Sequence, residues 1–165
     1  MPEPVLRIRL AQPDDARIIG VLIRRLARRW ILPDQTFEAG QALLARLSAR
    51  TLREKIAGGQ RFHLGYLGDR LVGVSAMRDD CHLVQFFVGT QYQGRGFARQ
   101  LWTRTMQDAL RRAGTRRFTL NATRCAVPVY RHLGFRATGP ERLSPSGLMT
   151  TPMRLVLPVR AGKSA

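Results

Sequence analysis

The spacing of apolar residues over the first sixty positions predicts one strand followed by helices. Residues 5–10 (VLRIRL) alternate between apolar and charged side chains, as half-buried strands do. Residues 13–15 (PDD) then begin a helix, because acidic side chains stabilise its positive end. A second helix is expected over 37–47 and a third, short one over 52–57. The first helix is continued by apolar residues at helical spacing: Ile18, Ile19, Leu22, Ile23, Leu26 and Trp30.

From residue 61 onward the apolar pattern changes from helical to extended. RFHLGYLG and RLVGVSAMR predict two strands around a Gly-Asp turn. HLVQFFV, residues 82–88, predicts a third strand whose continuous apolar character suits burial on both faces. A helix of about four turns follows, then the strand RRFTLNA and the short helix AVPVYRHL, which tolerates Pro128 in its first turn. Two final strands are expected, one from residue 134 and one over 153–157.

This order of elements predicts a single-domain α/β (α+β) fold. Hairpins alternate with a crossover, so we expect a mixed, mostly antiparallel sheet of roughly six to seven strands flanked by about four helices. No linker, repeat or low-complexity segment divides the chain. We therefore expect one domain over residues 1–160 and a disordered tail over residues 161–165.

The charge of the chain adds an affinity for anions. The 165 residues have a formal net charge of +17, almost all of it from arginine. Such a field attracts nucleic acid, acidic membrane surfaces or phosphate-rich cofactors. The arginines are scattered along the whole chain, so a merely solvated basic surface is the alternative.

Composition narrows the class of protein. A hydrophobic fraction of 44% can build a core without disulfides or metals. No apolar run approaches the roughly 20 residues of a membrane helix, and the N-terminus lacks a secretory signal. Two distant cysteines and three dispersed histidines give no ligand spacing, so no metal is expected. We expect a reduced, cytoplasmic protein without a membrane anchor.

A glycine-rich turn joins the strand 82–88 to the long helix. Glycines at a helix N-terminus let a phosphate approach the free backbone N–H groups. Two phosphate motifs fit poorly here. A P-loop needs Lys-Ser/Thr where Phe97 and Ala98 stand, and a Rossmann fingerprint needs Gly or Ala in place of Arg99. From the glycines alone, a tight bend without a ligand remains the alternative.

The turn resembles the acetyl-CoA signature of the GNAT superfamily of N-acetyltransferases, Gln/Arg-x-x-Gly-x-Gly/Ala, which reads QGRGFA at 93–98. NATRCAVPVYRHLGF at 121–135 is similar to the family's next strand and helix, and Thr90 departs from a frequent proline. The resemblance covers about residues 82–137. It implies a sheet splayed at its fourth and fifth strands. It also implies an acyltransferase that moves the acetyl group of acetyl-CoA to a primary amine by direct attack in a ternary complex.

The resemblance also implies a set of cofactor-binding residues. Amides of the turn would hold the diphosphate of acetyl-CoA, with Arg99 close by. The pantetheine arm would fill the splay, with backbone partners at Phe87 and Val88 and an amide contact at Asn121. The implied set is Phe87, Val88, Gln93, Gly94, Arg95, Gly96, Phe97, Ala98, Arg99 and Asn121.

Two side chains are candidates for catalysis. Tyr130 matches the family's tyrosine acid, and a phenol with a pKa near 10 stays protonated to supply the leaving thiolate; a half-buried packing role is the alternative. His82 falls where some members have a glutamate base, and an imidazole can accept a proton near neutral pH. His63 and His132 are weaker candidates. The amide of Val88 is the candidate donor to the oxyanion.

Two other functions stay open: a basic nucleic-acid-binding module and a non-catalytic acyl-CoA-binding protein. No nucleic-acid motif is present and aromatics do not interleave the arginines, so nucleic acid is possible but not favoured. We expect the acceptor to be a small-molecule or peptide amine. The positive charge slightly favours an anionic or neutral one, unless an acidic pocket forms from Asp34, Glu38, Asp79 and Asp80. Family members are often dimers, which leaves a homodimer possible.

Overall fold

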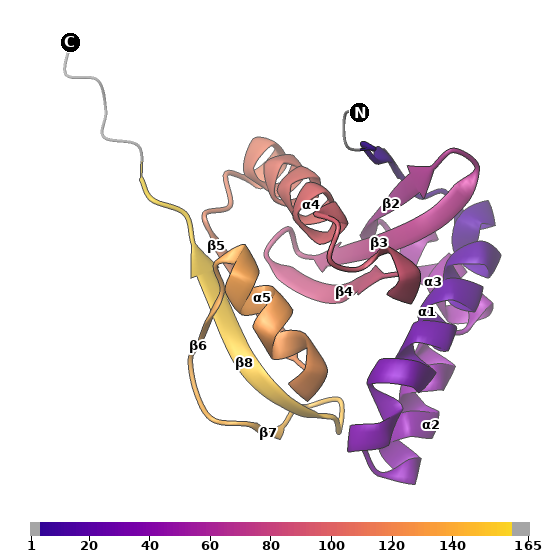
Figure 1. Ribbon diagram of the computed structural model, residues 1–165, viewed down its shortest axis with the longest axis vertical. Coiled ribbons are helices and arrows are strands. Elements are labelled where there is room, and N and C mark those ends of the chain that lie inside the picture. Colours follow the sequence, from indigo (N-terminus) through magenta and orange to yellow (C-terminus); the bar gives the residue numbers. More distant parts are fainter. Residues whose placement is uncertain (1–3, 160–165) are drawn as a thin grey trace.

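A mixed sheet of eight strands lies at the centre of this computed structural model, which describes residues 4–159 (Figure 1). The tail predicted to be disordered, residues 161–165, lies outside the described residues. The strands are β1 (Arg7–Leu10), β2 (Arg61–Leu67), β3 (Arg70–Arg78), β4 (His82–Val88), β5 (Arg117–Ala122), β6 (Arg136–Ala137), β7 (Arg142–Leu143) and β8 (Met149–Val156). The helices are α1 (Ala16–Trp30), α2 (Phe37–Arg46), α3 (Ala49–Ala57), α4 (Phe97–Ala113) and α5 (Val127–Leu133).

The sheet is divided between β4 and β5. Its order is β1-β2-β3-β4-β5-β8-β6, with β7 on the end of β8, and every pair is antiparallel except β4 with β5. That parallel pair joins only His82 to Thr119 and Leu83 to Leu120. Beyond these residues the two strands separate, as Figure 1 shows. The predicted fold class is confirmed, including the splay at the fourth and fifth strands.

Helices cover both faces of the sheet. On one face, α1 to α3 pack buried residues such as Ile19, Ile23 and Leu52 onto β2 and β3. On the other face lie α4 and α5, where the ring of Trp102 packs at 5.2 Å from Phe118 and 5.1 Å from Phe135. The aromatic cluster fixes α4 against the half of the sheet that carries β5.

Local capping explains where several elements differ from the sequence-based bounds. The third helix begins at Ala49, earlier than predicted, because the Ser48 hydroxyl accepts the amide of Thr51 at 3.2 Å. Residues 13–15 form a 3-10 turn before α1 rather than its first turn. The last strand starts at Met149 and was predicted too short, since its first residues are held by pairing with β7 and then with β5. The short strand β7 was missed.

Candidate active site

A cavity of about 1010 Å³ opens where β4 and β5 separate. Its walls come from α1 to α3, β4, the glycine turn, α5 and the loop before β8. Arg95 and Phe97 lie outside the lining: Phe97 is 1% exposed in the core, and the Arg95 guanidinium stacks on its ring at 5.2 Å. Ten of the predicted site residues line the cavity: His82, Phe87, Val88, Gln93, Gly94, Gly96, Ala98, Arg99, Asn121 and Tyr130.

The glycine turn adopts a backbone that other residues avoid. Gly94 has φ +76° and Gly96 has φ +82°, both in the left-handed region. A Cβ added at either position would meet no protein atom within 4 Å. The glycines therefore serve the backbone conformation, and they leave the space above the turn open to a bulky ligand.

The first turn of α4 keeps its amides free. The N-termini of α2 and α3 are capped by the side chains of Thr36 and Ser48, whereas α4 has no side-chain cap. Within residues 4–159, the amides of residues 94–99 donate to no protein acceptor. Instead the Gln93 side chain turns back and donates to the carbonyl of Val88 at 3.1 Å. Free amides on a helix dipole make an anion site.

Backbone polarity in β4 shows which groups face the gap. The amide of Gly89 donates to the carbonyl of Val72 at 2.8 Å, so Gly89 and Phe87 turn their backbone groups toward β3. The N–H groups of Phe86 and Val88 then point the opposite way, into the gap left by β5. The N–H groups that face the gap are therefore those of Phe86 and Val88, whereas the backbone of Phe87, a predicted cofactor contact, pairs with β3. The sequence analysis did not single out Phe86.

Across the gap, β5 offers Asn121. The amide of Thr119 donates to the carbonyl of Cys81 at 3.0 Å, so Asn121, two residues further on, turns its backbone to the same side. Its other neighbour is Pro152 of β8, which has no N–H to offer. Both edges of the gap therefore present backbone groups that no strand uses.

Tyr130 reaches the cavity from α5 and is 8% exposed. Its ring packs at 5.9 Å from Phe86 and 5.9 Å from Phe135. Within the described part of the chain the phenol oxygen makes no hydrogen bond, and it is not among the fully buried unpaired oxygens, so it borders the cavity. Burial raises the pKa of Tyr130, which keeps the phenol protonated.

His82 begins β4 at the closed end of the gap. Its Nδ1 lies 2.8 Å from the hydroxyl oxygen of Thr119, while Nε2 has no hydrogen-bond partner among residues 4–159. Burial lowers the pKa of His82 below its ordinary 6.5, and the positive charge of Arg78 lowers it further. The imidazole is therefore neutral at pH 7, as a proton acceptor must be.

The other two histidines occupy different surroundings. His63 is 3% exposed inside the core, outside the cavity, and burial lowers its pKa to about 4. His132 lines the cavity near the glycine turn, where its carbonyl accepts the Arg99 guanidinium at 2.8 Å. Only His82 combines a cavity position with the end of β4 that lies far from the turn.

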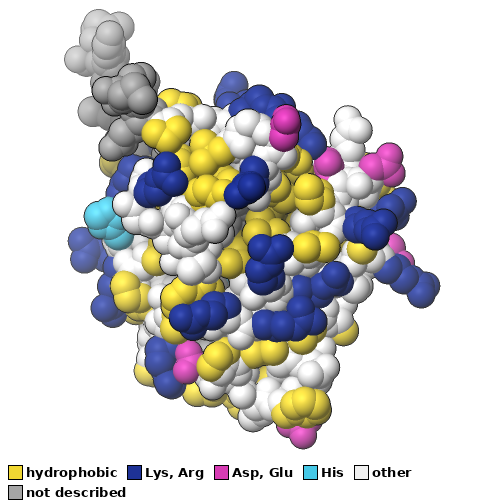
Figure 2. Space-filling view, turned by 45° about the vertical axis from the view of Figure 1, so that its right-hand side comes forward, with side chains coloured by type: hydrophobic (Ala, Val, Ile, Leu, Met, Phe, Trp, Pro, Cys, Tyr) yellow, Lys and Arg dark blue, Asp and Glu magenta, His cyan; other side chains and the backbone are white. Residues whose placement is uncertain are grey.

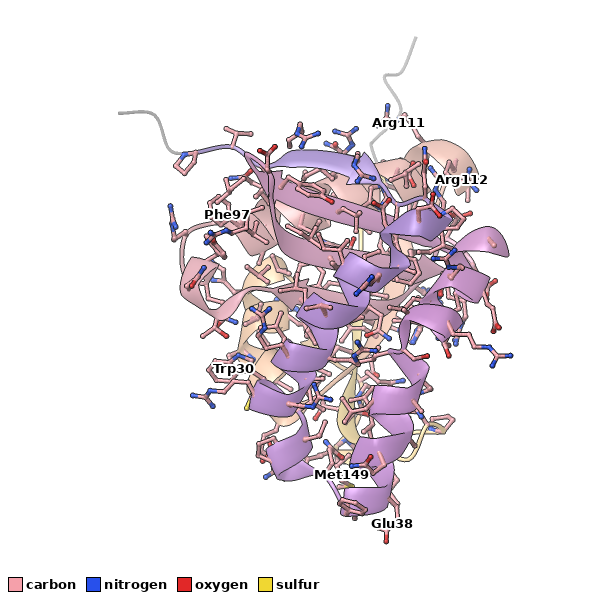
Figure 3. All side chains as sticks on the ribbon, turned by 90° about the vertical axis from the view of Figure 1, so that its right-hand side faces the viewer. Trp30, Glu38, Phe97, Arg111, Arg112 and Met149 are labelled. Carbon is pink, nitrogen blue, oxygen red and sulfur yellow. The ribbon has the colours of Figure 1, made fainter. Side chains whose placement is uncertain are left out.

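The four acidic residues considered as an acidic pocket do not gather. Asp80 lies 3.4 Å from Arg112 of α4, whereas Asp34 lies 3.8 Å from Arg124. Figure 3 shows Glu38 and Arg112 at opposite ends of the molecule. Among residues 4–159, no Asp or Glu lines the cavity.

Several cavity residues were not recognised in the sequence. Arg46, Lys55 and Arg78 line the end of the cavity near His82. Trp30, at the end of α1 in Figure 3, donates its indole N–H to Thr90 at 3.0 Å and so ties α1 to the turn. These residues carry no local motif, because packing of distant elements alone places them together.

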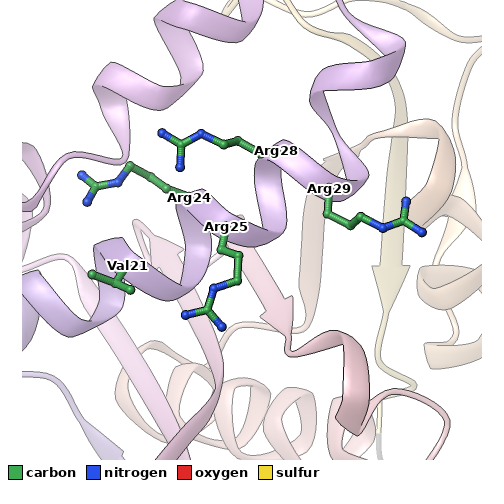
Figure 4. A pocket seen from close by; sticks show the side chains of 5 residues that line it. All are labelled: Val21, Arg24, Arg25, Arg28 and Arg29. Atoms are coloured by element: carbon green, nitrogen blue, oxygen red, sulfur yellow. The ribbon is translucent and has the colours of Figure 1, made fainter.

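Positively charged side chains are also found on the surface away from the cavity. Figure 2 shows Lys and Arg side chains scattered over one face with hydrophobic side chains between them. A separate shallow hollow of about 520 Å³ lies on the outer side of α1 (Figure 4), and none of the predicted site residues lines it. It is lined by Val21, Arg24, Arg25, Arg28 and Arg29.

Comparison with protein families decides the class of this site. The family model described as "Acetyltransferase (GNAT) domain" matches residues 31–157. The chain belongs to the GNAT acetyltransferase family. The protein is therefore an acyltransferase.

Solved structures agree with the GNAT fold. A GCN5-related N-acetyltransferase from Rhodopseudomonas palustris matches with TM-score 0.78 and 19% identity over 95% of this chain and 99% of its own. PaiA N-acetyltransferase from Thermoplasma acidophilum, in complex with coenzyme A, gives TM-score 0.73 and 13% identity over 92% and 98%. YncA from Salmonella typhimurium, with its cofactor acetyl-CoA, gives 0.63 and 18% over 97% and 98%. No curated protein matches the sequence.

Neither a membrane-spanning helix nor a metal-binding group is present within residues 4–159. No helix there is long and apolar enough to cross a membrane. No group of three or more His, Cys, Asp or Glu side chains within residues 4–159 could hold a metal ion.

Proposed function

We propose that this GNAT protein transfers the acetyl group of acetyl-CoA to a primary amine by direct attack in a ternary complex. The observation that carries the proposal is the row of unpaired amides at residues 94–99, at the open end of the gap between β4 and β5. Free helix N-terminal amides bind phosphate groups well. The coenzyme A and acetyl-CoA complexes of PaiA and YncA support the same cosubstrate here.

The edges of the gap suit the arm of the cosubstrate. The N–H of Val88 and the backbone of Asn121 would bind the pantetheine amides, as a missing strand would be bound. Arg99 stands beside the free amides of the turn, where its charge would complement the diphosphate. Acetyl-CoA, when bound, supplies the activated acyl group.

The amide of Phe86 is the better donor to the thioester oxygen. An acid that protonates the departing sulfur and a donor that stabilises the oxyanion must lie close together, since both act on one carbonyl group. Phe86 contacts the ring of Tyr130, whereas Val88 lies two residues nearer the turn. We therefore assign stabilisation of the oxyanion to the N–H of Phe86 and binding of the pantetheine arm to the N–H of Val88. This revises the sequence-based assignment, in which the amide of Val88 was the donor to the oxyanion.

Proton transfers fall to Tyr130 and His82. The buried phenol of Tyr130 holds its proton for the thiolate. His82 accepts a proton at Nε2 when its Nδ1–H donates to Thr119. Since His82 lies four residues before Phe86, about 13 Å along the strand, the proton would reach it through water.

The experiment is thiol release from acetyl-CoA in the presence of an amine panel, with wild type and Tyr130→Phe. Loss of the acid is expected to lower kcat by about 100-fold. Acetyl-CoA affinity, measured by calorimetry, should stay within about threefold, because the phenol lies away from the turn. Unchanged turnover in the variant would remove Tyr130 from the mechanism, and absence of acetyl-CoA binding by the wild type would refute the proposed function.

A further inference from the structure

Three cationic side chains lie at the end of the cavity farthest from the glycine turn. Arg46 ends α2, Lys55 lies in the last turn of α3, and Arg78 ends β3. Arg78 faces His82 across the β3–β4 hairpin, so the cluster borders the imidazole. The turn follows the far end of β4, about 20 Å away, which is too far for these charges to hold the diphosphate.

Carboxylates of the described residues leave this cluster largely uncompensated. Within residues 4–159 no carboxylate lies within 4 Å of Arg46 or Lys55. Asp79 lies 3.7 Å from Arg78, but the two side chains are 59% and 80% exposed, where an ion pair contributes little. Burial lowers the pKa of Lys55, and the charges of Arg46 and Arg78 lower it further, which places the three groups within electrostatic reach.

We propose that the acceptor is a small amine that also carries an oxyanion, and that Arg46, Lys55 and Arg78 bind this oxyanion beside His82. The inference rests on the proposed function, because it names the acceptor of the same site. A carboxylate and a phosphate share the required chemistry: oxygens that accept several charged N–H donors at once. A polycationic amine would meet three like charges and no carboxylate in the cavity lining of the described residues.

The cluster would also help the amine to react. An amine attacks only when it is neutral, and nearby positive charges lower the pKa of an ammonium group. An oxyanion bound by the three cations would hold the substrate in place while its amino group extends toward the gap. Binding and activation would thus come from the same residues.

The test compares kcat/KM for acceptors matched in their amine: phenylalanine with phenethylamine, phosphoethanolamine with ethanolamine, and spermidine as the polycation. At least one anionic member is expected to exceed its neutral partner by about tenfold or more. Lys55→Met and Arg46→Gln should each reduce that ratio by about tenfold through KM. Arg50 lies on α3, as Lys55 does, but it is exposed and does not line the cavity. Arg50→Gln therefore removes one charge outside the site and should leave the ratio unchanged.

The outcomes separate this inference from the proposed function. Equal turnover of neutral and anionic partners, or a preference for spermidine, would overturn the inference while the transferase activity stands. If acetyl-CoA binds but no member of the panel is acetylated, the affinity of each matched pair for the CoA complex, measured by titration, decides whether the oxyanion site exists. Selective binding of an anionic member, lost in Lys55→Met, supports the site, and no selectivity refutes it. Failure to bind acetyl-CoA at all refutes the proposed function itself.

Discussion

Burial gives single titratable residues the protonation state that acetyl transfer requires. The pKa of His82 is lowered by burial and by Arg78, so the imidazole is neutral, whereas the pKa of Tyr130 is raised by burial, so the phenol keeps its proton. The same physical effect therefore leaves a neutral imidazole and a protonated phenol on two walls of one cavity. Both identities were predicted from sequence, and both roles stay predictions.

The pH profile of kcat/KM tests His82. Protonation removes the base, so activity should fall on the acid side with a midpoint below the ordinary pKa of 6.5, because burial favours the neutral imidazole. His82→Gln should lower kcat/KM at pH 7.5 by about 100-fold and abolish the acid limb. His132→Gln is the matched control, and an unchanged acid limb in His82→Gln would assign the base elsewhere.

His63 should make stability depend on pH. Its folded pKa is about 4, against 6.5 for a free imidazole, so between these values the unfolded chain holds the extra proton. Stability is therefore lost as the pH falls from about 6.5 to about 4, by about 3 kcal/mol. Urea unfolding of wild type and His63→Leu at pH 7 and pH 4.5 measures it. A pH dependence identical in both proteins would contradict the prediction.

At the scale of elements, the sequence predicted the parts of the site that lie within one segment. The glycine turn, the helix that follows it and Tyr130 lie within residues 82–137, where the motif is continuous. Arg46 and Lys55 come from helices far away in the chain, and only their packing on β3 and β4 brings them to Arg78. The choice of Phe86 over Phe87 needs the strand register, which a one-residue slip would reverse.

An ion pair between Asp108 and Arg61 adds to the apolar packing that attaches α4 to the sheet. Asp108 of α4 receives two hydrogen bonds from Arg61 of β2, at 2.7 and 3.0 Å, with side chains 20% and 23% exposed. Asp108→Ala should lower the free energy of unfolding by about 2 kcal/mol, because Arg61 loses a charged acceptor. Chemical denaturation measures the loss.

An exposed pair on α3 supplies the control. Arg50 and Glu54 lie 3.5 Å apart with side chains 90% and 68% exposed. Glu54→Ala should change the free energy of unfolding by less than about 0.5 kcal/mol. Equal losses in the two variants would mean that the Arg61–Asp108 pair does not hold α4.

For the whole molecule, the pattern of strands and helices predicted the class of fold, while the net charge of +17 gave little guidance. Lys and Arg side chains lie scattered over the face shown in Figure 2 rather than in a single stripe. The local ratio of positive to negative side chains is more informative about the site: the cavity lining within the described residues contains cations and no carboxylate. Such a balance depends on the folded arrangement and cannot be read from totals.

The amides at the start of α4 are proposed to bind the diphosphate of acetyl-CoA. Gly96 and Gly114 stand at the two ends of α4, both at positive φ and both with no protein atom within 4 Å of an added Cβ. Aspartate at either position carries the same backbone strain and the same charge. At Gly96 alone, its carboxylate would occupy the amides and repel the diphosphate.

Calorimetric titration of acetyl-CoA into wild type, Gly96→Asp and Gly114→Asp is the most direct measurement. The amide site predicts that Gly96→Asp weakens binding by about 100-fold or more, while Gly114→Asp binds within about threefold of wild type. Wild-type affinity in Gly96→Asp, or an equal loss in both variants, would contradict it.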